Sequence, residues 1–248
     1  MKQFTACLMN EWAKLARRKK YWVLLALGMG VSLLSVLIKV LMGRISYGSL
    51  DLTGLNTASA MMGLFVNIWI PLVSMMAVCD LFAAEFQDLT IKATLLRPVH
   101  RFKIYCAKIG AVAVLVLVYL MGLFLASTVM DFLAGGGLGG VGYAFFAYLL
   151  DWIPLIVLIL MAAFINQCQK GSTMTMFLCI MVYIVLCVAG IAIPNLSGLL
   201  FTGYLTWHRL WLGHLLPMGA IFSKIALLLG YGLIFFSGGY LLFMKREV

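Results

Sequence analysis

The chain has 248 residues, of which 65% are hydrophobic and only 10% are charged, whereas soluble domains carry about 25% charged residues. This composition excludes an ordinary soluble domain and indicates an all-α polytopic membrane protein. The formal net charge is +10, but the basic residues are distributed as topology signals and form no continuous patch. Nucleic acid is therefore not an expected partner, whereas membrane lipid is.

Residues 1–20 form an amphipathic segment ahead of the first apolar run. Phe4, Leu8, Trp12 and Leu15 recur at helical spacing and make one apolar stripe. The pattern predicts an interfacial elbow helix on an anionic lipid surface, and its basic end serves equally as a topology signal. The basic residues expected at this membrane interface are Lys14, Arg17, Arg18, Lys19 and Lys20.

Six apolar runs are long enough to cross a hydrocarbon core of about 30 Å. They form a six-helix transmembrane domain over residues 21–248, and residues 194–219 are expected to form an outer hairpin before the sixth span. The expected spans are residues 21–42, 58–81, 104–130, 143–165, 172–193 and 220–244.

Several polar residues and prolines interrupt these runs. Pro71 is expected to kink the second span, and Asn67 nearby either joins two helices or lines a pathway. Asp151 and Pro154 interrupt the fourth span, whose first residues are expected to form a separate interfacial piece. Asp151 either caps the start of that span at the interface, the favoured interpretation, or lies within the membrane.

The basic residues predict the orientation of the chain. An even number of spans places both termini on one side, and loops on that side carry most of the 18 basic residues. The opposite loops carry Arg44 and Arg209. Because positive loops stay inside, we expect both termini in the cytoplasm. The fourteen residues on the terminal side are Lys2, Lys14, Arg17, Arg18, Lys19, Lys20, Lys92, Arg97, Arg101, Lys103, Lys108, Lys170, Lys245 and Arg246.

A cytoplasmic connector of mixed charge, residues 82–103, joins the second and third spans. As a helix it places Phe82, Phe86 and Leu89 on an apolar stripe and Glu85, Asp88 and Lys92 on another face. Pro98 ends that helix, because proline has no N–H and restricts the residue before it. Such a segment either lies on the lipid surface as a solvated connector or docks a soluble partner.

No catalytic motif is apparent in the sequence. The glycine-rich run at 135–140 lacks the GK[ST] ending of a phosphate loop, so we expect no ATP hydrolysis and no cofactor on this chain. His208 and His214 are six residues apart, but interfacial hydrogen bonding is favoured over metal binding, and no metal site is expected.

The connector resembles the first cytoplasmic loop of ABC-2-type transporter permeases. In that family a glutamate leaves the second span, followed by a threonine, basic residues, leucines and a proline. The start of the chain, Asn10-Glu11, Lys14-Leu15 and Arg17–Lys20, is similar to the family's elbow helix. Leu89 departs from the pattern, which usually has glycine there. The matching connector residues are Glu85, Thr90, Lys92, Leu95–Leu96, Pro98, Arg101 and Lys108.

The resemblance implies a non-enzymatic membrane subunit that works with separate ATPases. Two permease chains, identical or paired with a sister, would assemble with two cytoplasmic ABC ATPase subunits that hold ATP and Mg. The connector would be a coupling helix seated in a groove of an ATPase. The residues implied in this docking are Phe82, Glu85, Phe86, Asp88, Leu89, Lys92, Leu95, Pro98 and Arg101.

The implied activity is export of an amphiphilic or hydrophobic substrate from the bacterial cytoplasmic membrane or the cell. Small permeases of this size resemble those of lantibiotic immunity and bacitracin resistance, so peptide antibiotics are the favoured cargo. The alternatives are a membrane anchor that recruits a cytoplasmic partner without transport, and export of a drug, lipid or ion.

Overall fold

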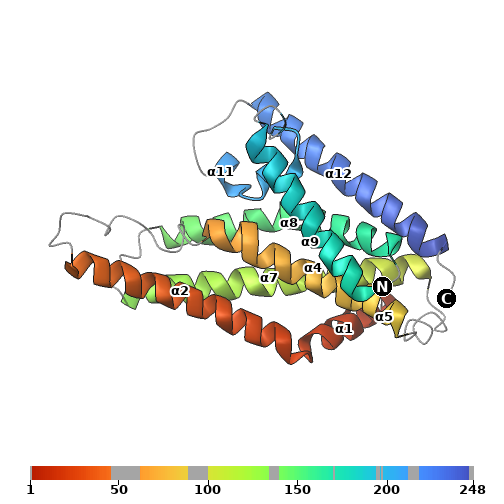
Figure 1. Ribbon diagram of the computed structural model, residues 1–248, viewed down its shortest axis with the longest axis horizontal. Coiled ribbons are helices and arrows are strands. Elements are labelled where there is room, and N and C mark those ends of the chain that lie inside the picture. The colour runs from red at the N-terminus through yellow and green to blue at the C-terminus, as the bar shows by residue number, and fades with distance from the viewer. Residues whose placement is uncertain are drawn as a thin grey trace.

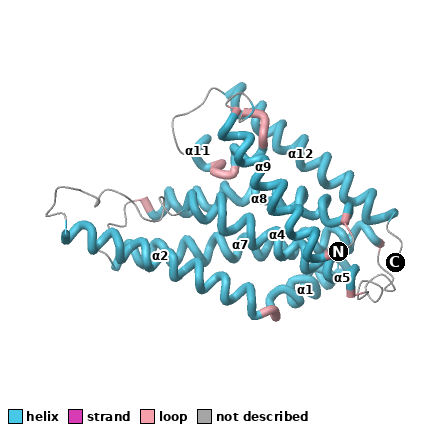
Figure 2. Tube along the Cα trace, in the orientation of Figure 1, coloured by secondary structure: helices cyan, strands magenta, loops and turns pink. Residues whose placement is uncertain are grey.

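The computed structural model describes residues 2–45, 62–88, 100–133, 140–169, 171–193, 196, 198–211 and 218–245. Over these residues the regular structure is all helical, as the composition predicts, and contains no strand (Figure 2). The helices, in chain order, are α1 Lys2–Ala16, α2 Lys19–Ile45, η2 Phe65–Trp69, α4 Ile70–Leu81, α5 Ala83–Gln87, α7 Arg101–Leu133, α8 Val141–Cys168, α9 Ser172–Ala192, η3 Phe201–Tyr204, α11 His208–Trp211 and α12 Met218–Lys245.

Five helices in the described ranges are long and apolar enough to span a membrane. The remaining predicted span corresponds to α2, which has 27 residues and exposes Trp22, Leu27 and Leu34 along its length. It is not among the five, so the count of six spans stays a prediction. The five helices are Met62–Gln87, Arg101–Met130, Val141–Cys168, Ser172–Ala192 and Ile221–Lys245.

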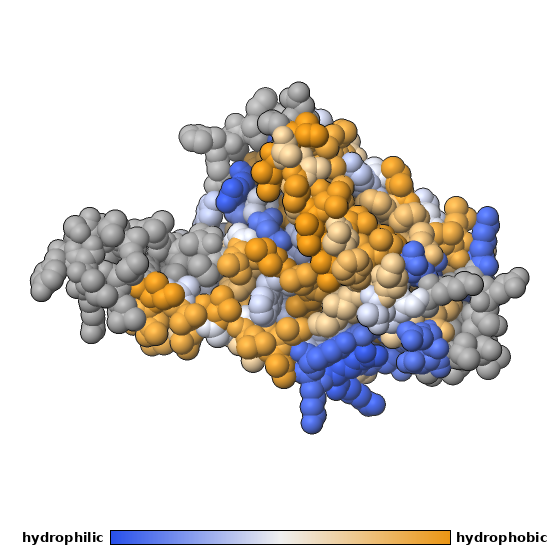
Figure 3. Space-filling view, in the orientation of Figure 1, coloured by the Kyte–Doolittle hydropathy of each residue, from blue (hydrophilic) through white to orange (hydrophobic). Residues whose placement is uncertain are grey.

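The core lies along α4, α7 and α8, and the remaining long helices surround it (Figure 1). Helix α7 packs against α1 and α2 on one side and against α4 and α8 on the other. By contrast, α9 and α12 expose most of their apolar residues. Their outer surface is strongly apolar, as Figure 3 shows, which is typical of a lipid-facing surface or of one that meets a partner within the membrane.

One helix boundary and one expected interruption differ from the predictions made from the sequence. The amphipathic helix α1 ends at Ala16, and Lys19 already begins α2 after a turn at Arg17 and Arg18. Helix α8 is continuous from Val141 to Cys168, so the predicted interruption of the fourth span was wrong. A proline inside a helix removes only one hydrogen bond, and packing on both sides of α8 maintains the helix through it.

The expected distortion at Pro71 takes the form of a turn of π-helix. The π-helix η2 ends at Trp69, directly before α4, which has Pro71 in its first turn. Proline has no N–H to donate to the carbonyl of Asn67 four residues earlier. The hydroxyl of Tyr183 on α9 donates to this carbonyl over 2.5 Å. A side chain from a neighbouring helix thus satisfies the backbone group that Pro71 cannot.

Replacing Tyr183 with phenylalanine should leave the Asn67 carbonyl without this donor. We expect a loss of about 1 kcal/mol in unfolding free energy, since single side-chain hydrogen bonds in membrane proteins contribute about 0.6 to 1.7 kcal/mol. Unfolding in mixed detergent micelles measures the effect. Tyr143→Phe is the control, because Tyr143 is 43% exposed on α8, and equal stability of the two variants would contradict the prediction.

Candidate functional site: a buried ionic cluster beside the connector

Four charged side chains from three parts of the chain meet where the connector begins. We call Glu11, Lys14, Glu85 and Lys108 the ionic cluster. They come from α1, α5 and α7, which are far apart in sequence. Lys14 Nζ lies 2.7 Å from Glu11 and 2.9 Å from Glu85, and Lys108 Nζ lies 3.1 Å and 2.7 Å from the same two carboxylates. The two lysines therefore alternate with two glutamates in a closed ring.

Lys108 is the centre of this cluster. Its side chain is fully buried, and its ammonium has three donors. They reach Glu85, Glu11 and the carbonyl of Leu81, the last at 2.9 Å. Leu81 is the last residue of α4, so a single cation joins the end of α4, the connector and α1 to α7. A buried charge is tolerated only when it is paired and hydrogen-bonded in this way.

The cluster also shifts the titration of its α1 members. Burial raises the pKa of Glu11, but the charge of Lys108 and the hydrogen bond from Lys14 outweigh it and hold the pKa below its ordinary value of 4.5. For Lys14 burial lowers the pKa, and hydrogen bonds to Glu11 and Glu85 outweigh it and raise the pKa. Both groups are therefore held in their charged forms at neutral pH.

The lowered pKa of Glu11 predicts a loss of stability in acid. A carboxylate with a depressed folded-state pKa stabilises the fold above its unfolded pKa, and this contribution disappears as the pH falls through the folded value. Below about pH 4.5 the melting temperature of the wild-type chain should fall more steeply than that of Glu11→Gln. Melting curves from pH 7 to 3 measure both slopes. Parallel curves would contradict the prediction.

A second charged group anchors the turn between α1 and α2. Asp80, near the end of α4, accepts from Arg18 at 2.9 Å and from Lys20 at 2.5 Å, and Tyr21 also donates to it. Tyr119 on α7 donates to the carbonyl of Tyr21. The second half of α1 and the turn that follows it are thus held against the same pair of helices, α4 and α7.

The structure distributes the predicted docking residues between the core and the surface. Phe82 is fully buried, and Glu85 lies inside the ionic cluster. Phe86 is half-buried against Phe243, whereas Asp88 is exposed. Arg101 begins α7 and donates to the carbonyl of Met244 at 2.9 Å. The remaining predicted residues, Leu89, Lys92, Leu95 and Pro98, lie outside the described residues.

Of the five basic residues predicted at the membrane interface, some are exposed on the surface and others form ion pairs within the chain. Arg17 and Lys19 are exposed, and a hydrophilic patch lies where α1 meets α2 (Figure 3). The other three, Lys14, Arg18 and Lys20, bind acidic groups of the chain itself. These three residues therefore form ion pairs within the protein and also contribute charge to its surface.

Asp151 lies inside α8, ten residues after its start, so its predicted role as a cap was wrong. Because the helix continues through Leu150, the residue has no free helix end to cap. Its buried carboxylate accepts from the backbone N–H of His208 at 2.7 Å and lies 2.9 Å from the Nδ1 atom of the same residue. Asn67 bonds the carbonyl of Gly63 in its own helix. Among the residues that the structure covers, no three potential ligands are grouped for a metal, and His214 lies outside them.

The sequence-based interpretation did not bring Glu11 and Lys108 together. It assigned Glu11 to a surface helix and Lys108 to the entrance of a span. The feature of the sequence that could have indicated this pairing is the scarcity of charge, since the chain has only 8 acidic residues. A lysine within an apolar run requires a partner, and an acidic residue such as Glu11 on a neighbouring amphipathic helix is a candidate.

The fold and the cluster define a multi-pass helical membrane protein in which α1 and the connector share one ionic site. The chain belongs to the ABC-2 family: the family model described as "ABC-2 family transporter protein" matches residues 7–187. A search of curated proteins found no match. Family membership makes the chain a permease subunit of an ABC transporter, which associates with an ABC ATPase.

Proposed function

We propose that this chain is the permease of an ATP-driven exporter in the bacterial cytoplasmic membrane, with six spans and both termini in the cytoplasm. Two permease chains would work with two ATPase subunits that hold ATP and Mg. The substrate class we propose is an amphiphilic or hydrophobic molecule. Within this class, peptide antibiotics of the lantibiotic and bacitracin type are the favoured substrates. The apolar composition of the spans supports such a cargo.

The observation that carries the coupling proposal is the position of Lys108. In the described part of the connector, Gln87 and Asp88 are exposed and could meet an ATPase. The side chain of Gln87 also accepts from the N–H of Ser172, so the start of α9 belongs to the same surface. Two residues before Gln87 in sequence, the buried Glu85 binds Lys108 and Lys14.

This arrangement separates docking from transmission. Asp88 and its neighbours would contact the ATPase, whereas Glu85 would pass a displacement of the connector to α7 and the elbow helix. Charged pairs within a protein are stronger than pairs in water and hold elements together as one body. In this proposal Glu85 is a positioning residue and not a contact residue.

Two variants test the two roles separately in the reconstituted complex with its ATPase. Asp88→Arg should reduce co-purification of the ATPase, because it reverses an exposed charge at the docking surface. Glu85→Gln should retain the ATPase but lose most of the substrate-stimulated hydrolysis, since the amide keeps the shape without the charge. Lys19→Glu, an exposed charge reversal at the start of α2 and outside the connector, is the control.

Normal assembly of Asp88→Arg together with normal stimulation of Glu85→Gln would contradict the proposal. Assembly without any substrate-dependent hydrolysis in the wild-type complex would instead favour the non-transporting anchor. The substrate class is tested with a panel of peptide antibiotics on cells with and without the complex. Unchanged sensitivity to the whole panel would contradict the proposed cargo.

A further inference from the structure

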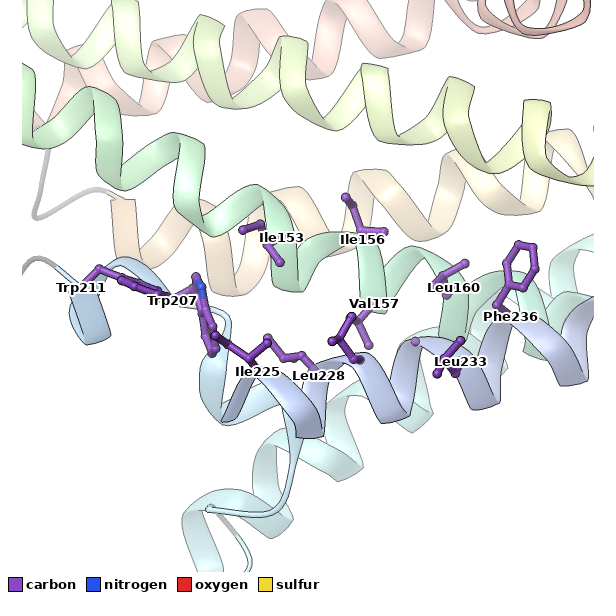
Figure 4. Close-up of a pocket in the computed structure, with 12 residues that line it drawn as sticks. Ile153, Ile156, Val157, Leu160, Trp207, Trp211, Ile225, Leu228, Leu233 and Phe236 are labelled. Carbon is purple, nitrogen blue, oxygen red and sulfur yellow. The ribbon is translucent and has the colours of Figure 1, made fainter. Parts of the chain in front are cut away.

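An apolar cleft lies between α8 and α12, at the exposed side of the molecule (Figure 4). It has a volume of about 460 Å³, within the range of about 300 to 1,000 Å³ typical of small-molecule sites. All twelve lining residues are apolar, and Gly232 contributes the only position without a side chain. Trp207 and Trp211 lie at one end and Phe236 at the other.

The cleft is elongated and opens sideways. It follows α12 from Ile225 to Phe236, which corresponds to about 16 Å at 1.5 Å per residue. This is about half of a hydrocarbon core of 30 Å, the depth of one leaflet. Leu229 and Leu233 line the cleft but are 62% and 69% exposed, so its mouth faces the surroundings of the helix bundle.

The tryptophan end of the cleft carries positive charge. Lys224, adjacent to the lining residue Ile225, places its ammonium 5.1 Å from the centre of the Tyr204 ring. That ring packs edge-on against Trp207. Arg209 lies between the two tryptophans in sequence and is exposed. The nearby carboxylate of Asp151 is occupied by His208, and in the described part of the chain neither Lys224 nor Arg209 forms an ion pair.

We propose that this cleft binds an acyl chain of an anionic membrane lipid, whose phosphate group lies at Lys224 and Arg209. The apolar wall supports an acyl chain rather than a peptide, because peptide N–H and C=O groups would remain unpaired there. The tryptophans lie where the apolar chain meets the polar headgroup, the position that such rings favour at membrane interfaces. The site does not depend on the proposed transport activity.

The test uses the full-length chain without any ATPase, in lipid nanodiscs. The probe is phosphatidylglycerol with a photoreactive diazirine in one acyl chain, compared with phosphatidylcholine carrying the same chain. Labelled peptides are identified by mass spectrometry. We expect labelling concentrated on residues 153–160 and 225–236, and stronger with phosphatidylglycerol. Labelling spread evenly over the apolar surface of α9 and α12 would overturn the site.

Two matched glycine variants test whether the cleft itself is occupied. Gly232→Leu should lose most of the labelling, because a Cβ at Gly232 points towards Leu160 at 3.8 Å and a leucine would fill the cleft. Gly230→Leu places the same side chain on the same helix where a Cβ would meet nothing within 4 Å, and should label normally. Equal labelling of the two variants would overturn the proposal.

The headgroup is tested by replacing Lys224 and Arg209 together with glutamine. The expected result is that phosphatidylglycerol labels the cleft no better than phosphatidylcholine does. Equal labelling by the two lipids in the wild-type chain would overturn the anionic preference. Size-exclusion profiles of all variants establish that each one is folded, so that a loss of labelling reports on the site.

Discussion

Replacing Lys108 with methionine is expected to destabilise the protein by about 3–5 kcal/mol, the usual cost of removing one partner from a buried ion pair. Methionine fills a similar volume but leaves Glu11 and Glu85 without the buried cation, while Lys14, which pairs with both, is partly exposed. Two carboxylates would then face each other in a poorly hydrated place. Thermal unfolding in detergent, followed by size-exclusion chromatography, measures the loss.

Lys103→Met is the matched control for this variant. It makes the same substitution on the same helix, where the lysine bonds Gln3 at 3.3 Å near the surface, and should cost less than about 1 kcal/mol. Adding Glu11→Gln and Glu85→Gln to Lys108→Met should restore most of the stability, because the two carboxylates are then neutral and the charge of Lys14 is partly exposed to water. A Lys108→Met protein as stable as Lys103→Met would show that the cluster does not hold the fold together.

Gly239→Ala is expected to disrupt the packing of α12 on the bundle, at about 1–3 kcal/mol for an overpacked core position. A Cβ at this position would clash with the hydroxyl oxygen of Tyr105 and would lie 3.4 Å from the backbone of Phe164. Tyr105 cannot move aside easily, because it is fully buried among four aromatic rings at centroid distances of 5.5 to 5.9 Å.

A second substitution isolates this clash. The hydroxyl of Tyr105 has no hydrogen-bond partner among the described residues, so Tyr105→Phe alone should cost nothing or stabilise slightly. In combination with Gly239→Ala it should recover most of the loss, because the clashing atom is gone. Gly230→Ala, where a Cβ has open space, is the neutral control. Failure of Tyr105→Phe to rescue Gly239→Ala would contradict this account.

The predicted helical spans agree with the structure where the apolar runs are uninterrupted. Helices α7 and α9 match the predicted spans 104–130 and 172–193 closely, because length and hydrophobicity alone decide them. The prediction failed at α8, where Asp151 and Pro154 were taken as breaks. The aspartate and the proline favour a break locally, but tertiary contacts stabilise the continuous helix, since His208 binds the aspartate.

By itself the sequence therefore determined an all-helical membrane protein, its connector and its likeness to ABC-2 permeases. These follow from composition, periodicity and motif order, which are local properties of the chain. Only the tertiary structure decided that Glu85 faces inwards and that Glu11, Lys14 and Lys108 surround it. Helical periodicity places a charge on a face but does not say which distant helix that face meets. The buried lysine required partners, and the fold brought them from 97 and 23 residues away.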